Sequence, residues 1–122
     1  MRPRSRPLSA LLLLPLFAGC GGGDGTGPGG GNVVEIHLTA SSRFSPDNVT
    51  IAPGTTVRWI NDADILHTVT PSNPQQPGVW ARAERATRGV VLEHRFTVAG
   101  QTYHYFCEPH LTAGMTGTIR VQ

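Results

Sequence analysis

The chain has 122 residues, of which 39% are hydrophobic and 15% are charged, so it has enough material for one small domain. All ten of its basic residues are arginine, and three of them, Arg2, Arg4 and Arg6, stand in the first six positions. Without these three, seven arginines face eight carboxylates, for a net charge of about −1. This balance excludes an extended basic surface for nucleic acid.

Residues 1–19 predict a lipoprotein signal peptide. The arginines form a basic start, and an apolar run over residues 8–18 follows, with small residues before Cys20. That run of about eleven residues is far shorter than the ~20 needed to span a bilayer as a helix. The segment Phe-Ala-Gly-Cys at 17–20 resembles the bacterial lipobox, in which the cysteine becomes the acylated first residue of the mature protein. We therefore expect an exported protein, periplasmic or at the cell surface, tethered to a membrane by lipid at Cys20. An ordinary cleaved signal is the alternative.

Residues 20–31 join this cysteine to the rest of the chain through the sequence GGGDGTGPGGG, which predicts a flexible linker. Residues 32–122 then predict a single domain. If Cys20 is acylated, Cys107 is the only thiol of the mature chain, so no disulfide framework is available. An exported free thiol is open to oxidation unless a metal holds it.

The signals of the domain are β almost throughout. Alternating patterns at 33–39 and 55–60 predict half-buried strands. A short strand is predicted at 49–51, and a Pro-Gly turn at 53–54 joins it to the strand at 55–60. Further strands are predicted at 67–70, 93–98, 102–107 and 117–121. About seven short strands punctuated by Gly and Pro predict the all-β class, as a two-sheet Greek-key sandwich. For residues 78–88 the sequence is compatible with either a short helix or a loop.

Four side chains carry metal-ligating atoms in an informative pattern: His67, Cys107, His110 and Met115. Two imidazoles and one thiolate, with a weak thioether, form the ligand set of a blue-copper electron-transfer site cycling between Cu(I) and Cu(II). Zinc prefers four firm ligands, and calcium prefers oxygen. The last three lie on one loop, in which Pro109 stiffens the turn and Gly114 allows a tight bend.

Residues 33–122 resemble the plastocyanin-like cupredoxins. The resemblance is carried by residues 55–61 (TTVRWIN), 64–69 (DILHTV), 103–110 (YHYFCEPH) and 114–121 (GMTGTIRV). It implies that His67, Cys107 and His110 are equatorial copper ligands and Met115 the axial one. It also implies that the imidazole edge of His110 is an electron port within an apolar patch. Phe106 stands where a Tyr is common, and Thr68 where an Asn is frequent.

We therefore predict a protein that is not an enzyme and that shuttles single electrons between membrane-associated redox partners, as a monomer. A multicopper enzyme would need further His pairs for a second copper centre. A copper-trafficking or storage lipoprotein of the same fold is the alternative function. Other residues are given structural roles: His37, His94 and His104 as solvated strand residues, Trp59 and Trp80 as packing residues, and Tyr103 as a hydrogen-bonded corner. For Arg82, Arg85 and Arg88 a solvated face and an acidic partner both remain open.

Overall fold

A computed structural model describes residues 31–122 of the chain. The predicted signal peptide, the lipidation at Cys20 and nearly all of the predicted linker lie outside the described residues. Within residues 31–122, no helix is long and apolar enough to cross a membrane.

The described residues form nine strands and one short 3-10 helix. The strands are β1 (Val33–Leu38), β2 (Phe44–Ser45), β3 (Asn48–Ile51), β4 (Thr55–Asn61), β5 (His67–Pro71), β6 (Ala83–Arg85), β7 (Gly89–Phe96), β8 (Thr102–Phe106) and β9 (Thr116–Val121), and the helix is η1 (Glu108–Ala113). The count exceeds the expected seven because β2 and β6 are short segments without a clear sequence pattern.

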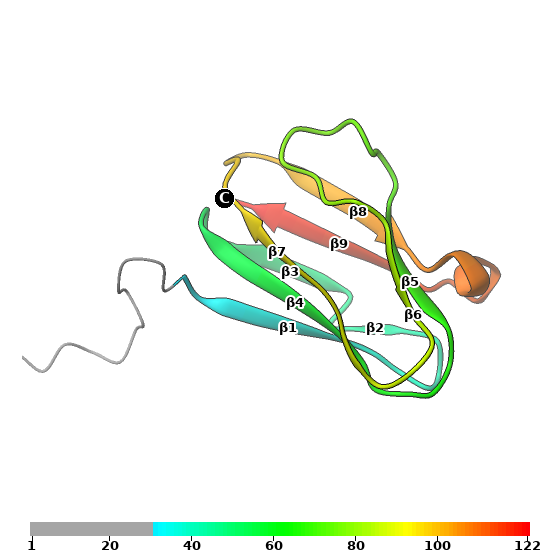
Figure 1. Cartoon of the computed structure of the whole chain (residues 1–122). Coiled ribbons are helices and arrows are strands. Elements are labelled where there is room, and N and C mark those ends of the chain that lie inside the picture. Colours follow the sequence, from blue (N-terminus) through cyan, green and yellow to red (C-terminus); the bar gives the residue numbers. More distant parts are fainter. Residues whose placement is uncertain (1–30) are drawn as a thin grey trace, which may run out of the picture.

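The strands form two sheets that lie over each other, which confirms the predicted sandwich (Figure 1). One sheet has the order β2-β1-β4-β7 and the other the order β3-β9-β8-β5-β6. The pairs β1/β4 and β3/β9 are parallel, and the remaining pairs are antiparallel. The helix η1 projects at the end of the sandwich opposite the C-terminus (Figure 1).

Aromatic side chains fill the space between the sheets. The ring of Trp59, from β4, lies 5.1 Å from that of Trp80 and 5.7 Å from that of Tyr105. Phe44 contacts Tyr105 edge-to-face with ring centroids 4.7 Å apart, a favoured aromatic arrangement. Trp59 and Trp80 are buried, as predicted. The large rings of β4 and β8 therefore anchor the strands that lead to the predicted ligands.

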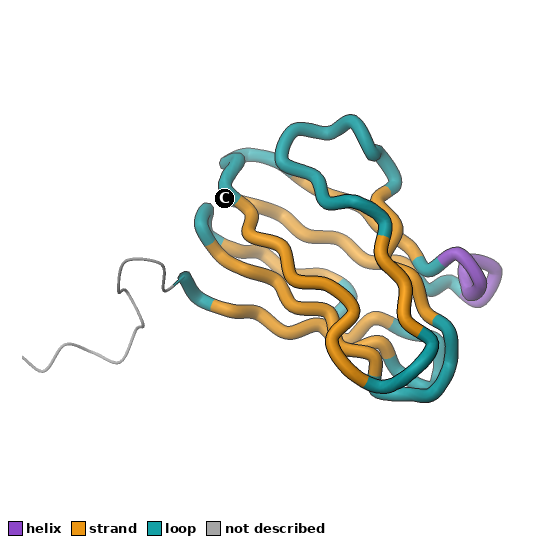
Figure 2. The backbone as a smooth tube through the Cα atoms, in the orientation of Figure 1, coloured by secondary structure: helices purple, strands orange, loops and turns teal. Residues whose placement is uncertain are grey.

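The connection between β5 and β6 is an irregular loop, so the short helix considered for residues 78–88 is not formed (Figure 2). Side chains of the core hold this loop. Trp80 donates its indole N–H to the carbonyl of Val69 at 3.2 Å, and Tyr103 donates its hydroxyl to the carbonyl of Pro77 at 2.6 Å. The second bond confirms a structural role for Tyr103. After the loop, β6 pairs with the free edge of β5, and this pairing overrides local helix propensity.

Candidate metal centre

Two neighbouring strands bring the predicted ligands together. His67 is the first residue of β5, and Cys107 directly follows β8. The two strands are antiparallel neighbours, and their last residues pair, with Thr70 opposite Phe106, so the start of β5 lies beside the segment that follows β8. Tyr103 and Tyr105 of β8 are buried, as is Cys107 directly after it, whereas His104 is exposed, which is the two-residue alternation of a strand.

The loop after Cys107 is held by its own backbone. Cys107 donates its N–H to the carbonyl of Met115 at 3.0 Å, and Met115 donates its N–H to the carbonyl of His110 at 3.2 Å. His110 in turn donates its N–H to the carbonyl of Cys107 at 3.2 Å. Gly114 ends η1 with a φ of 80°, a conformation that favours glycine. These bonds hold Cys107, His110 and Met115 close to one another.

Three ligand atoms converge at this point. Sγ of Cys107 lies 3.6 Å from Nδ1 of His67 and 3.3 Å from Nδ1 of His110. The three atoms all lie within 4.8 Å of one another, and no other group of His, Cys, Asp and Glu in residues 31–122 could hold a metal ion. Metal bonds of about 2.0–2.3 Å to nitrogen and sulfur place the corners of a flat trigonal site about 3.5–4 Å apart. The donor set therefore fits one ion bound by two imidazoles and a thiolate, as copper prefers.

Burial differs among the predicted ligands. His67, Cys107 and Met115 are fully buried, whereas His110 is half-buried. Burial lowers the pKa of His67, and the neighbouring His110 lowers it further, while the Thr39 backbone acts in the opposite direction. A lowered pKa favours the neutral imidazole, which is the form that binds a metal. The thioether of Met115 is buried, and the backbone of Met115 hydrogen-bonds both Cys107 and His110.

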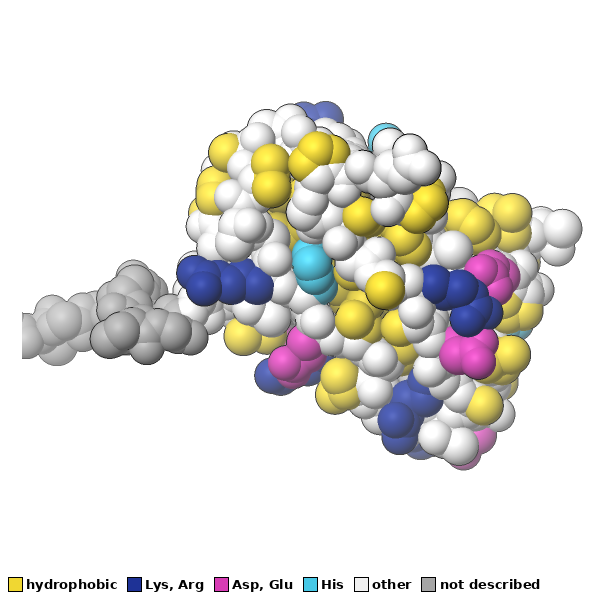
Figure 3. Space-filling view, turned by 45° about the horizontal axis from the view of Figure 1, so that its top comes forward, with side chains coloured by type: hydrophobic (Ala, Val, Ile, Leu, Met, Phe, Trp, Pro, Cys, Tyr) yellow, Lys and Arg dark blue, Asp and Glu magenta, His cyan; other side chains and the backbone are white. Residues whose placement is uncertain are grey.

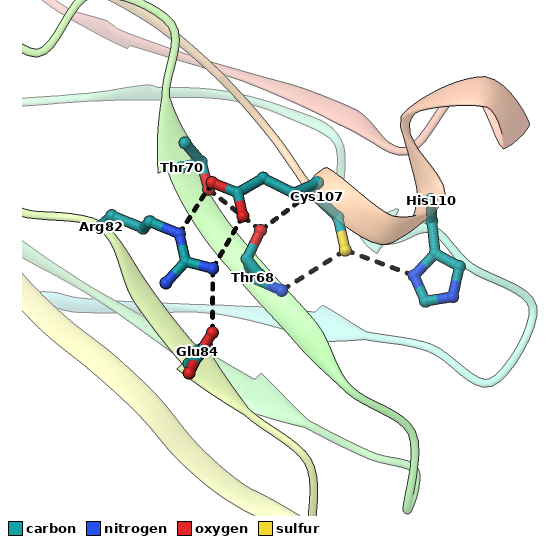
Figure 4. Close-up of polar contacts among 7 residues, drawn as sticks. Thr68, Thr70, Arg82, Glu84, Cys107 and His110 are labelled. Carbon is teal, nitrogen blue, oxygen red and sulfur yellow. Dashed lines mark hydrogen bonds and ion pairs between the residues drawn. The ribbon is translucent and has the colours of Figure 1, made fainter.

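The thiolate has a donor from the neighbouring strand. The N–H of Thr68 points at Sγ of Cys107 at 3.4 Å, and the Thr68 hydroxyl accepts the N–H of Glu108 at 2.8 Å (Figure 4). Thr68 thus links the two ligand-bearing segments through its hydroxyl and its backbone. Next to it, Thr70 and Arg82 both bond the Glu108 carboxylate. The sequence alone indicated no role for Thr70, and it left Arg82 open between a solvated face and an acidic partner, because both contacts depend on strand pairing.

Asn61 is another residue whose structural role the sequence alone did not indicate. Its buried side chain donates to the carbonyls of Ile65 at 2.9 Å and Arg85 at 3.0 Å. Its amide oxygen accepts the N–H of Ala63 at 3.0 Å. Asn61 therefore fixes the loop that leads from β4 to His67. The signal in the sequence that could have revealed this role is an amide side chain on the same face of β4 as Val57 and Trp59.

The other singled-out residues lie away from the centre or at its rim. His37, His94 and His104 lie at the surface and hydrogen-bond Asp62, the Gly78 carbonyl and Thr118 respectively. Leu66 and Leu111, each next to a predicted ligand, are 43% and 49% exposed. On the face that Figure 3 shows, the arginines of residues 31–122 stand apart from one another, and Arg82 is ion-paired with Glu84 and Glu108.

Comparisons with known proteins agree with this geometry. Residues 33–122 match the model of the copper-binding proteins of the plastocyanin/azurin family. Plastocyanin of Scenedesmus fuscus is 42% identical over 99 residues, which cover 73% of this chain and 99% of that protein. A purple cupredoxin from Nitrosopumilus maritimus superposes with a TM-score of 0.58 at 26% identity, covering 73% of this chain and 99% of the other. Oxidised plastocyanin of the fern Dryopteris crassirhizoma has a TM-score of 0.57 at 18% identity over 73% and 100%, a likeness of fold alone.

Proposed function

Because the chain belongs to the plastocyanin/azurin family of copper-binding proteins, we propose that His67, Cys107, His110 and Met115 hold one copper ion. Proteins of this family are electron carriers and not enzymes. The observation that carries the ligand assignment is the convergence of one thiolate and two imidazole nitrogens within 4.8 Å at the joined ends of β5 and β8. The protein would carry one electron at a time between redox partners.

Each ligand has a distinct task in this proposal. Bound copper supplies the one-electron Cu(I)/Cu(II) couple. Cys107 and the two histidines form the trigonal set, and Met115 is the weak axial donor. The backbone bonds among Cys107, His110 and Met115 fix the loop in advance. Little rearrangement of the protein then accompanies a change of oxidation state, which keeps electron transfer fast.

We assign the electron port to His110, since this ligand is half-buried while the other three are fully buried. The residues around it on the loop are apolar or small, and all of them are exposed: Pro109, Leu111, Ala113 and Gly114. An exposed apolar rim lets a partner exclude water and approach the imidazole edge closely. Phe106 stands where a Tyr is common in the family, so this strand offers no phenol as a second electron route.

The membrane tether is a separate part of the proposal. The signal-like residues 1–19 and the lipobox-like segment ending at Cys20 support export and acylation. A lipid at Cys20 would hold the domain near membrane-associated redox partners. Expression in a bacterial host with labelled fatty acid should label the protein and place it in the membrane fraction. Cys20→Ala should abolish both results, and equal labelling of this variant would contradict the tether.

Copper reconstitution tests the electron-transfer function. Addition of Cu(II) to the purified protein should give an intense visible thiolate-to-copper band and fast, reversible voltammetry. A colourless site with irreversible voltammetry would instead support copper trafficking or storage. Size-exclusion chromatography of the domain without its lipid should show a monomer.

A further inference from the structure

The Cys107 loop is closed by a ring of hydrogen bonds that starts and ends on Glu108. The N–H of Glu108 donates to the Thr68 hydroxyl at 2.8 Å, and the Thr70 hydroxyl donates to the Glu108 carboxylate at 3.1 Å. The two threonine hydroxyls lie 3.0 Å apart. Since the Thr70 proton is used on Glu108, the Thr68 hydroxyl must donate to Thr70. Every group in the ring then has a partner, and the residue after Cys107 is fixed from both its backbone and its side chain.

Arg82, which directly precedes β6, binds the Glu108 carboxylate. Its guanidinium donates to both Glu108 oxygens at 2.7 Å, and to Glu84 at 2.9 Å (Figure 4). A two-pronged bond of this kind suits the planar fork of arginine and orients the carboxylate. The contact joins the β6 edge of the sheet to the loop that carries the thiolate.

This ion pair contributes little to the stability of the fold. The side chains of Arg82 and Glu108 are 44% and 40% exposed, and exposed ion pairs typically add only about 0–1 kcal/mol. We expect the ion pair to act mainly on the electrostatic potential at the neighbouring Cys107 thiolate. A carboxylate next to a redox metal favours the more positive, oxidised state, and a cation bound to that carboxylate cancels the effect.

We propose that Arg82 is a positioning residue for the metal centre. It orients Glu108 within the hydrogen-bonded ring and cancels its charge, and so keeps the reduction potential of the bound copper high. This inference rests on the proposed copper function. It gives Arg82, the first of the three arginines of residues 82–88, a role toward the metal centre.

The test compares potentials of the copper-loaded full chain. Arg82→Gln leaves the Glu108 carboxylate uncompensated and should lower the potential, whereas Glu108→Gln should raise it. The double variant should return close to the wild-type value. Both shifts should shrink at high ionic strength, because the groups are exposed. Arg58→Gln is the matched control, since Arg58 also bonds two glutamates but lies on the other sheet.

A second measurement follows the ring in the copper-free protein. Arg82→Gln should speed amide hydrogen exchange at Glu108 and Thr68, while Arg58→Gln should not. Arg82→Lys keeps the charge without the fork, so it should hold the potential near wild type while still speeding exchange at Glu108. Single variants that shift the potential in the same direction, or no more than Arg58→Gln does, would overturn the inference. A wild-type protein without the blue band would refute the proposed function instead, and the exchange data would still decide whether Arg82 orders the loop.

Discussion

Replacement of Gly117 by alanine probes the packing behind the metal centre. Gly117, on β9, lies opposite Tyr105 of β8, and its backbone has no positive φ that would itself favour glycine. An added Cβ would lie 2.6 Å from Cε2 of the Tyr105 ring and closer still to Cζ and the hydroxyl oxygen. The ring would have to move by more than about 1 Å to reach an ordinary contact distance of about 3.5–4 Å.

The surrounding side chains leave no space for this movement of the Tyr105 ring. The Tyr105 ring is fully buried, with its centroid 4.7 Å from that of Phe44 and 5.7 Å from that of Trp80. Overpacking of a filled core costs about 1–3 kcal/mol, and the rigid rings put this case at about 3 kcal/mol. In a domain of this size each kcal/mol lowers Tm by about 4–8 °C, so we expect a fall of roughly 12–24 °C.

Calorimetry of the copper-free protein is the measurement, with Gly100→Ala as the control. Gly100 has a φ of 78° and no atom within 4 Å of an added Cβ, so this variant isolates backbone strain of about 1 kcal/mol. Tyr105→Phe removes one clashing atom, a buried hydroxyl without a hydrogen-bond partner among the described residues, and should recover part of the loss in Gly117→Ala. If Gly117→Ala melts no lower than Gly100→Ala, the sheets yield around the methyl group and the packing argument is wrong.

Three further substitutions test the site itself. Met115→Leu should retain copper and raise the reduction potential, because a weak donor to Cu(II) is lost; voltammetry showing a fall would contradict the axial role. Cys107→Ser should abolish the blue band, and a retained band would mean that another residue supplies the sulfur. Asn61→Ala should cost about 3 kcal/mol in denaturant titrations, because it removes a buried side chain that donates to the carbonyls of Ile65 and Arg85 and accepts from Ala63, and it should speed copper loss. Asn73→Ala, at an exposed turn, should change neither, and equal effects of the two variants would show that the loop needs no fixing by Asn61.

The ligand loop could be predicted because its geometry is local. Cys107, His110 and Met115 lie within nine residues, and Pro109 and Gly114 mark the bends between them. A strand was also predicted at 102–107, and Cys107 is buried like Tyr103 and Tyr105, which are two and four residues before it. His67 is different, since it lies forty residues upstream of Cys107 and reaches the site only through the pairing of β5 with β8. Family resemblance supplied that contact where periodicity could not.

The contacts around the thiolate could not be predicted for the same reason. The register of β5 and β6 places Thr68 opposite Glu84, and this brings Arg82 to Glu108. No local pattern fixes such a register in a three-residue strand. The Ala, Glu and Arg content of residues 80–86 instead suits a helix, but tertiary pairing decides the outcome in so short a segment.

Strand pairing and the closed loop together explain how the fold positions the metal donors. His67 and Cys107 lie at the ends of two adjacent strands, and the loop from Cys107 to Met115, which carries His110, is closed by backbone hydrogen bonds. The lowered pKa of His67 favours its neutral form, so little work against protonation is needed at that ligand near neutral pH. These contacts within the fold hold the donors in place for copper. A redox carrier needs this property, because any ligand that moved with the oxidation state would slow each transfer.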